Sequence, residues 1–322
     1  MVSLVHRPSL ELTEFHGMVT VAPNMRALFQ LLARVSATDA SIILRGETGT
    51  GKELAARALH ALSHRKGGPF VAINCATLTP ALAASELFGH QRGAFTGAVA
   101  SRVGLFARAR RGTVFLDEVA ELSLDIQGRL LRVLQERNFV PLGASDPIQA
   151  DVRIITATHS SLRDAVEART FREDLMFRIR VVPLLIPPLA ERPGDIEALF
   201  WHLVDEIGGR ANRRVDAMTE EAYARLLEYP FPGNVRELRN FVEYAFAVGE
   251  RDVFGVHDFP PEFRGETYRK PRQLSRPQLV PAERHEIAQA LQDARGQKSV
   301  AAEMLGISRT TLWRRMRELE LG

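Results

Sequence analysis

Short apolar runs alternate with helical patterns along the chain from about Phe15 to Arg192. Four of these runs are continuous rather than alternating with polar residues, which is typical of parallel strands covered on both faces. They span residues 41–44, 70–73, 113–116 and 152–155. Helical patterns, such as residues 52–63 and 126–136, lie between them. This order predicts an α/β fold with a parallel sheet enclosed by helices.

The pattern changes after Pro193, where the strand-like runs stop. Three helical segments follow, over residues 195–207, 219–228 and 234–248, and Thr219 is a suitable N-cap for the second. We expect them to form a helical subdomain beside the sheet. Prolines then interrupt a polar stretch, which predicts a linker; they lie at positions 260, 261, 271, 277 and 281.

The C-terminal residues predict a compact helical module. Residues 282–294 are amphipathic, and Gly296 ends this helix. Ser299 can cap a second short helix, and Gly306 supplies the turn before a third. Two helices joined by a glycine-containing turn form a helix-turn-helix, and the alternative is an ordinary basic helical hairpin.

These changes divide the chain into five segments. We expect a short tail, an α/β subdomain, a helical subdomain, a linker and a helix-turn-helix module, over residues 1–15, 16–192, 193–259, 260–281 and 282–322 respectively. The tail is too short for a sensory domain, so we expect no regulatory domain before the α/β subdomain.

Composition narrows the class of protein. Of the 322 residues, 45% are hydrophobic and 25% are charged, as in ordinary globular proteins. No stretch approaches the roughly 18 apolar residues of a membrane helix, and the N-terminus lacks an export signal. Cys75 is the single cysteine, which excludes an internal disulfide. We therefore expect a cytoplasmic protein without a membrane partner.

Charge gathers toward the C-terminus. From Arg264 onward there are twelve Lys and Arg residues against seven Asp and Glu, whereas the formal net charge of the whole chain is only +3. A basic segment on a near-neutral body favours a polyanionic partner. Residues near the start of the third predicted helix would face the major groove of DNA. The candidate DNA contacts are Ser308, Arg309, Thr310, Thr311, Arg314 and Arg317.

A glycine-rich string follows the first strand and opens a helix, which is the context of a phosphate-binding loop. It consists of Gly46, Glu47, Thr48, Gly49, Thr50, Gly51, Lys52 and Glu53. Glycines let the backbone approach phosphates, and Lys52 would meet the β- and γ-phosphates of ATP. Glu53 stands where the general motif has Ser or Thr to bind Mg²⁺, so a chance glycine turn stays open at this point.

An acidic pair ends another predicted strand, at Asp117 and Glu118. The carboxyl ends of parallel strands share one edge of the sheet, so these carboxylates would lie beside the phosphate loop. Asp117 would hold Mg²⁺, and Glu118 would orient or deprotonate the attacking water. The alternative for such a pair is a helix N-cap. Together, the loop and the acids predict an ATPase.

A hexapeptide between these two motifs points to one family. Gly93, Ala94, Phe95, Thr96, Gly97 and Ala98 form the signature sequence of bacterial enhancer-binding proteins, the sigma-54-dependent activators of the AAA+ class. Its small residues leave Phe95 and Thr96 as the only substantial side chains of a loop that can pivot. The resemblance implies that the hexapeptide contacts sigma-54; taken alone, it could be a surface turn with a buried Phe95.

The resemblance extends from about Phe15 to Leu321, and the family typically carries Glu at position 53. It implies that Asn74 restrains Glu118 and links the γ-phosphate to the hexapeptide loop. Arg172 and Arg178 match arginines that act on the ATP of a neighbouring subunit, although surface salt bridging is the usual role of such residues.

The resemblance also bears on the lid and on two unusual positions. Arg236 matches a lid arginine that contacts nucleotide phosphate. His159 stands where many AAA+ proteins have Asn, and Thr20 stands where many relatives have Gly near the adenine, so nucleotide affinity could differ.

The resemblance implies an ATP-driven activity together with its assembly and its partners. ATP and Mg²⁺ would bind between subunits of a ring, expected to be a hexamer, or in a hetero-oligomer with a paralogue. Hydrolysis would drive sigma-54 RNA polymerase from a closed to an open promoter complex, while the C-terminal module holds enhancer DNA. An inhibitory protein acting in trans is a further expected partner. The alternatives are a DNA-binding regulator with a vestigial ATPase and an AAA+ remodeller of another client.

Overall fold

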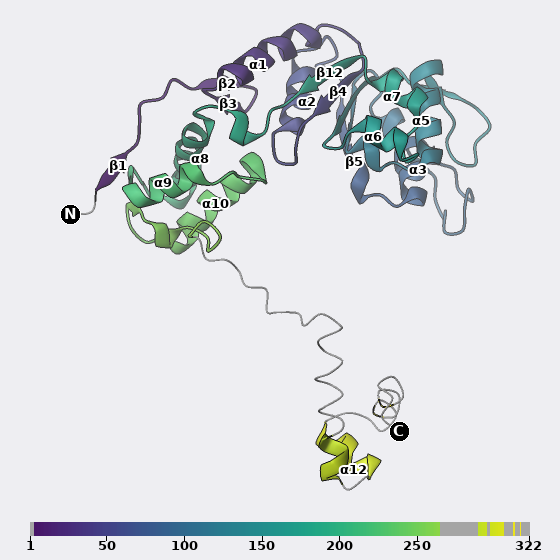
Figure 1. The fold of residues 1–322 in the computed structure, drawn as a ribbon. Coiled ribbons are helices and arrows are strands. Elements are labelled where there is room, and N and C mark those ends of the chain that lie inside the picture. The colour runs from purple at the N-terminus through teal and green to yellow at the C-terminus, as the bar shows by residue number, and fades with distance from the viewer. Residues whose placement is uncertain (1–2, 265–288, 295–296, 306–311, 313–315, 317–322) are drawn as a thin grey trace. The chain divides into compact units, whose positions relative to one another are not determined.

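The computed structural model describes residues 3–264, 289–294, 297–305, 312 and 316. They belong to two compact units, Met1–Gly265 and Glu266–Gly322 (Figure 1). In the part of the chain that the structure describes, no helix is both long enough and apolar enough to cross a membrane.

A five-stranded parallel sheet forms the centre of the first unit. Its strands, in spatial order, are β12 (Val182–Leu185), β4 (Ile42–Arg45), β11 (Arg153–Thr158), β8 (Thr113–Asp117) and β5 (Phe70–Asn74). The four predicted strands are thereby confirmed, and the fifth, β12, was missed. Proline cannot donate a ladder hydrogen bond and is tolerated on edge strands, so Pro183 hides this strand from a sequence pattern.

Helices cover both faces of this sheet, which confirms the predicted α/β fold (Figure 1). Ile42 and Leu44 pack with helices α1 (Pro23–Ser36) and α2 (Lys52–Ala61). Ile43, between them, packs on the opposite face with the other helices. These are α3 (Pro80–Phe88), α4 (Leu105–Arg108), α5 (Leu124–Glu136), α6 (Leu162–Glu167) and α7 (Glu173–Ile179). Burial on both faces explains why the strands read as unbroken apolar runs.

Small hairpins and ribbons border the sheet. Strands β2 (Thr13–Phe15) and β3 (Met18–Thr20) pair with each other, as do β6 (Gly89–His90) with β7 (Arg102–Val103) and β9 (Asn138–Phe139) with β10 (Ile148–Gln149).

Three helices form the lid, with an aromatic-rich core of their own. They are α8 (Asp195–Ala211), α9 (Glu220–Glu228) and α10 (Asn234–Val248), and they lie together in Figure 1. The Thr219 hydroxyl accepts a hydrogen bond from the Ala222 N–H at 3.2 Å, as predicted for an N-cap.

The expectation that strands end at Pro193 was wrong. Strand β13 (Ala217–Thr219) pairs with β14 (Val253–Phe254) and with β1 (Leu4–His6), so part of the expected tail belongs to the lid. Strands of two or three residues are too short to show a readable alternation, and the partner of β13 lies about 200 residues away in the sequence.

In the second unit, described residues form α12 (Lys298–Met304) and the end of an earlier helix up to Ala294. Ala290, Ala301, Leu312 and Met316 are buried in a small core. The predicted DNA contacts Ser308, Arg309, Thr310, Thr311, Arg314 and Arg317 lie outside the described residues.

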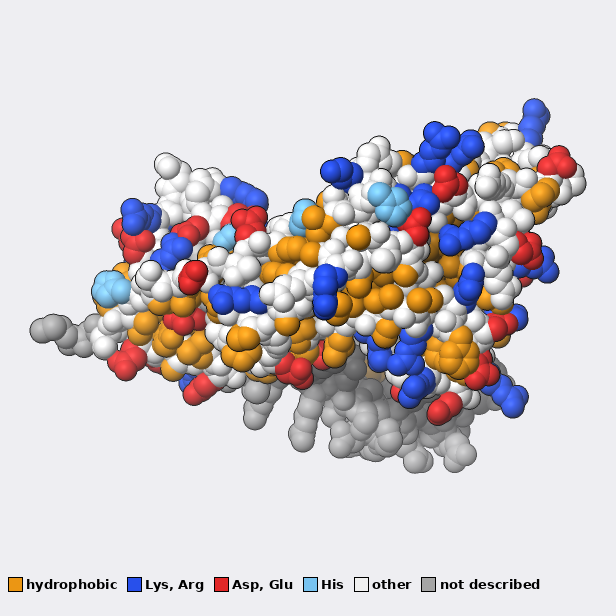
Figure 2. Space-filling model, turned by 90° about the horizontal axis from the view of Figure 1, so that it is seen from above, with side chains coloured by type: hydrophobic (Ala, Val, Ile, Leu, Met, Phe, Trp, Pro, Cys, Tyr) orange, Lys and Arg blue, Asp and Glu red, His pale blue; other side chains and the backbone are white. Residues whose placement is uncertain are grey.

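The charges on the described surface are mixed. On the face drawn in Figure 2, acidic and basic side chains are interspersed around a central band of hydrophobic ones. The described part of this face therefore carries no extended field of one sign, and its charge does not favour a polyanion.

Candidate functional site

A cavity of about 620 Å³ lies between the sheet edge and the lid. Its walls include residues 48–51 of the phosphate loop, which is defined here as residues 46–51, together with Lys52, Asn74, Asp117, Glu118 and Arg236. Elements far apart in the sequence thus bring the predicted nucleotide residues together. The volume suits a cofactor-sized ligand.

The phosphate loop connects β4 to α2. Gly49 and Gly51 have φ angles of +83° and +105°, a region that favours glycine. Lys52 is 7% exposed, and its ammonium group donates to the carbonyl oxygens of Gly46 (2.8 Å) and Glu47 (3.2 Å). Glu53 points its carboxylate at Arg57, at 2.7 Å on the surface of α2.

Asp117 ends β8 and Glu118 follows it. Glu118 is held from two sides, because its Oε1 lies 3.3 Å from Lys52 Nζ and its Oε2 lies 2.7 Å from His159 Nδ1. The His159 backbone N–H also donates to Oε2, at 3.1 Å. Asp117 Oδ1 accepts from the Glu118 N–H at 3.1 Å.

The two carboxyls differ in their electrostatic environment. Burial, reinforced by the negative charge of Glu118, raises the pKa of Asp117 above its usual value. Burial also acts to raise the pKa of Glu118, but the hydrogen bonds from His159 and the charge of Lys52 outweigh it, so this pKa is lowered. Glu118 is therefore the carboxyl held in the charged form.

The donor set suits Mg²⁺ bound together with phosphates. Within the described residues there is no group of three or more His, Cys, Asp and Glu side chains that could hold a metal ion by themselves. Mg²⁺ usually needs only one or two carboxylates when phosphate oxygens and waters complete its shell. The Asp117 carboxylate, beside the phosphate loop, meets that requirement.

Asn74 lies opposite Asp117 in the β5–β8 register and also lines the cavity. Its side-chain oxygen accepts from the Ala76 N–H at 2.9 Å, which caps the turn after β5. In the described part of the chain, Glu118 forms its ion pairs with Lys52 and His159, so a restraint by Asn74 stays a prediction.

Thr20 is fully buried and does not line the cavity. Its hydroxyl donates to the carboxylate of Asp195, the first residue of α8, with oxygen distances of 2.7 and 2.8 Å. The backbone N–H groups of Val21 and Ala22 donate to the same carboxylate. The hydroxyl of Thr20 therefore fastens the lid to the segment after β3.

Three residues of the site have roles that the sequence did not predict. They are Glu47, which accepts a hydrogen bond from Asn234 of the lid, and Arg192 and Arg239. Arg192 is 4% exposed and donates to the Thr50 carbonyl oxygen at 2.8 Å. Arg239 pairs with Glu206 of α8 at 2.8 Å. Single arginines and acids carry no distinctive spacing, so no local signal identified these contacts.

The hexapeptide, called the contact loop below (residues 93–98), joins β6 to β7. Phe95 is 46% exposed at its tip, edge-to-face with His90 at a ring distance of 5.0 Å. His90 in turn contacts the Ser85 hydroxyl (2.7 Å) and the Ala100 carbonyl (2.9 Å). The tip is thus presented to solvent from a braced stem, and Thr96 is exposed beside Phe95.

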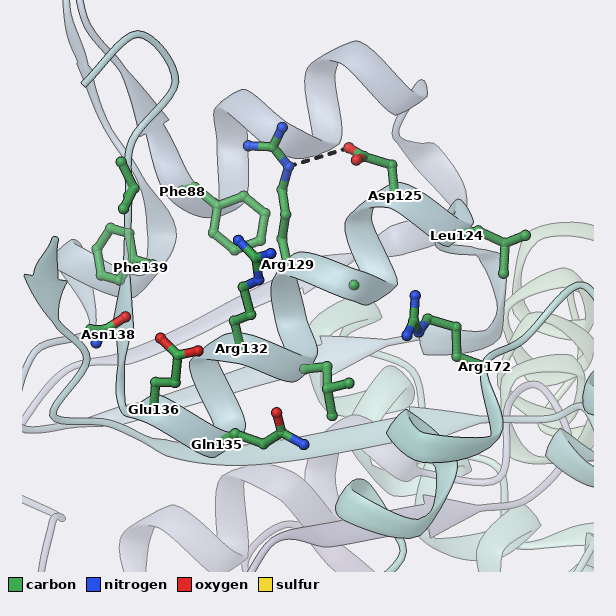
Figure 3. Close-up of a pocket in the computed structure, with 13 residues that line it drawn as sticks. Phe88, Leu124, Asp125, Arg129, Arg132, Gln135, Glu136, Asn138, Phe139 and Arg172 are labelled. Carbon is green, nitrogen blue, oxygen red and sulfur yellow. Dashed lines mark hydrogen bonds and ion pairs between the residues drawn. The ribbon is translucent and has the colours of Figure 1, made fainter. Parts of the chain in front are cut away.

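The two arginines predicted to act between subunits lie elsewhere. Arg172 pairs with Asp174 at 2.7 Å on the rim of a hollow of about 610 Å³, which Figure 3 shows together with Arg129 and Arg132 of α5. This hollow shares no lining residue with the nucleotide cavity. Arg178 donates to the Leu134 carbonyl oxygen at 3.1 Å. Neither arginine lines the cavity of its own chain.

Three protein families match the chain in sequence order. They are the Sigma-54 interaction domain over residues 18–185, the AAA+ ATPase lid domain over residues 190–276 and the Fis family of bacterial regulatory proteins over residues 278–319.

Relatives cover nearly the whole chain. Regulatory protein AtoC of Escherichia coli (strain K12) is 40% identical over 309 residues, which are 93% of this chain and 67% of AtoC. DNA-binding transcriptional regulator NtrC of Azospirillum brasilense is 38% identical over 332 residues, covering 93% and 69%. The crystal structure of NtrX from Brucella abortus in complex with ADP has a TM-score of 0.71 at 33% identity, covering 94% and 70%. The same protein in complex with ATP has a TM-score of 0.70.

Proposed function

Because this chain belongs to the family of bacterial regulators that combine a sigma-54 interaction domain, an AAA+ lid and a Fis-type helix-turn-helix, we propose that it hydrolyses ATP to open promoter complexes of sigma-54 RNA polymerase. The observation that carries this proposal is the convergence of Lys52, Asp117 and Glu118 on one cavity. The same unit exposes Phe95 of the contact loop.

The contacts of Glu118 support a role in hydrolysis. Its charged carboxylate can accept a proton from, or orient, a water that attacks the γ-phosphate. Lys52 now shares its charge between Glu118 and loop carbonyls, and phosphate oxygens would compete for it. Binding of ATP would thereby free Glu118 Oε1 while His159 keeps Oε2 in place. Mg²⁺ held by Asp117 would neutralise part of the negative charge of the phosphates.

Ring assembly would complete the site. Arg172 directly precedes α7 and Arg178 lies on it, and neither lines the nucleotide cavity of its own chain. For either of these two guanidinium groups to stabilise charge on a γ-phosphate, it would act on the ATP of a neighbouring copy, which requires head-to-tail contacts between subunits such as those of a closed ring. The exposed side chain of Arg172 suits such a role, and we infer the hexamer of the family.

The contact loop would transmit the conformational change driven by ATP hydrolysis to sigma-54. Its half-exposed Phe95 gives an apolar contact, and the glycines at both ends permit movement. The helix-turn-helix would hold the ring near its promoter by binding enhancer DNA, which raises its local concentration.

The test is ATP-dependent open-complex formation by sigma-54 polymerase on a supercoiled promoter. The wild-type protein should open the promoter, whereas Thr96→Ala should hydrolyse ATP at a rate within about twofold of wild type yet open it at least about tenfold less. Thr38→Ala, a change at another exposed threonine, is the matched control and should behave as wild type. ATP turnover by the wild-type protein without promoter opening would reject sigma-54 polymerase as the client.

A further inference from the structure

Three consecutive carbonyl groups of the phosphate loop accept hydrogen bonds from the lid side. The Thr48 carbonyl accepts from Asn234 Nδ2 at 3.1 Å, and the Gly49 carbonyl accepts from the Val235 N–H at 3.1 Å. The Thr50 carbonyl accepts from Arg192 Nη2 at 2.8 Å. The lid therefore grips the backbone of the loop as well as facing its cavity.

Asn234 makes the first of these contacts and two further ones. It is fully buried, and it begins α10 with a φ angle of +54°, a conformation that Asn adopts more readily than most residues. Its side-chain oxygen accepts from the Leu189 N–H at 2.7 Å. Its amide nitrogen donates to Glu47 Oε2 (3.0 Å), as well as to Thr48. One side chain thus ties the lid helix, the connection before α8 and the phosphate loop.

These contacts orient the loop for an anion. In a planar trans peptide the N–H points away from the carbonyl that precedes it. Holding the carbonyls of residues 48–50 toward the lid therefore turns the N–H groups of residues 49–51 the opposite way. Successive N–H groups on one side of a turn form the kind of concave site that binds phosphate.

We propose that Asn234 is a positioning residue, through which the lid holds the phosphate loop in its binding conformation before nucleotide binds. The lid contributes to nucleotide affinity through this side chain, which does not line the nucleotide cavity. By thermodynamic linkage, bound nucleotide must tighten the docking of the lid to the same degree. This inference rests on the proposed nucleotide site, but not on sigma-54.

The supporting turn is built for this contact. Glu237 Oε2 accepts from the Gly233 N–H at 2.7 Å, and its Oε1 accepts from the Tyr229 hydroxyl at 3.0 Å. A Cβ on Gly49 would lie 2.2 Å from the Gly233 carbonyl oxygen, so the two backbones pack with no room for a side chain.

The direct test is titration of the full-length protein with a fluorescent ADP analogue. Asn234→Asp keeps the acceptor for Leu189 but replaces the donor with a charge beside Glu47, so the Kd should rise about tenfold. Adding Glu47→Gln restores a donor opposite the new carboxylate and should recover at least half of that loss on a logarithmic scale. Asn240→Asp, an equivalent change on the exposed side of the same helix, should leave the Kd unchanged.

Two further readouts separate positioning from a general loss of structure. At saturating ATP, kcat of Asn234→Asp should stay within about twofold of wild type, so the defect appears in KM. In the wild-type protein, ADP should slow hydrogen exchange of amides at residues 234–238.

A Kd for Asn234→Asp within twofold of wild type overturns this inference alone, and so does wild-type exchange that ADP leaves unchanged. A wild-type protein that binds no nucleotide overturns both this inference and the proposed function. Intact binding without promoter opening counts against the proposed function only.

Discussion

The phosphate loop and the contact loop are both rich in glycine, for different physical reasons. In the phosphate loop, a Cβ on Gly46 would lie 2.8 Å from the Ile186 carbonyl oxygen, and one on Gly49 would meet the lid at 2.2 Å. In the contact loop, a Cβ on Gly93 or Gly97 would meet nothing within 4 Å, although their φ angles are +82° and +101°. Glycine permits close packing at positions 46 and 49 of the first loop, and only an unusual backbone angle at position 51 and in the second loop.

This difference separates a loop that the lid clamps from a loop whose glycines have open space around them. The phosphate loop has neighbours on the lid side at every residue from Thr48 to Thr50. The tip of the contact loop has solvent around its glycines and a braced stem at His90. Glycine content alone therefore does not show how tightly a loop is held, and the surroundings of each glycine decide.

The largest effect is expected for Gly49→Ala. The new methyl group would meet the Gly233 carbonyl and would also impose a disfavoured φ, so the lid and the loop must separate. We expect nucleotide affinity to fall at least about hundredfold, measured by ADP titration. Gly67→Ala, at a glycine with open space and no positive φ, should bind as wild type. Near-normal affinity in Gly49→Ala would show that the clamp is not needed.

A smaller and different effect is expected for Gly97→Ala. No neighbour is displaced, but an L side chain at a φ of +101° is strained, which shifts the conformations open to the contact loop. Promoter opening should fall about tenfold while ADP affinity stays within twofold of wild type. Parallel losses of binding and opening would contradict the separation of the two loops.

The smallest effect concerns pH and the turn that supports the clamp. Burial, together with Glu237, raises the pKa of Tyr229 to about 12 in the folded protein. Because this folded pKa exceeds the unfolded value near 10, the stability it contributes is present below pH 10 and is lost as pH rises through about 12. After discounting for solvent screening we expect about 1 kcal/mol, measured by urea unfolding between pH 9 and 12. The unfolding free energy of Tyr229→Phe should not fall in this pH range. If it falls as much as that of the wild-type protein, other groups cause the loss of stability.

Much of the fold could be predicted because the local pattern and the tertiary environment agree. The four central strands are buried on both faces, which imposes unbroken apolar runs, and α10 begins and ends at the predicted residues. Strand β12 escaped because Pro183 is acceptable only at the sheet edge, a position that a pattern does not report.

The candidate site also has residues that the sequence predicts and contacts that it does not. The phosphate loop and the acids Asp117 and Glu118 form contiguous motifs, so their place at one sheet edge followed from the sequence. The contact of Glu118 with His159 spans 41 residues, and that of Glu47 with Asn234 spans 187. The first pair depends on β8 and β11 being neighbours in the sheet and the second on how the lid docks, and no spacing within a motif encodes either.

The lid is attached to the rest of its unit at separate points. One attachment is the carboxylate of Asp195, which holds Thr20 and the backbone after it. Another is β1, which leaves the α/β subdomain and joins the lid sheet beside β13. A third attachment is the phosphate loop, whose carbonyl groups at residues 48–50 accept hydrogen bonds from Asn234, Val235 and Arg192. Only this third attachment includes residues that line the nucleotide cavity, so a ligand in the cavity would act on the lid through it, while Asp195 and β1 hold the lid at places that the ligand does not touch.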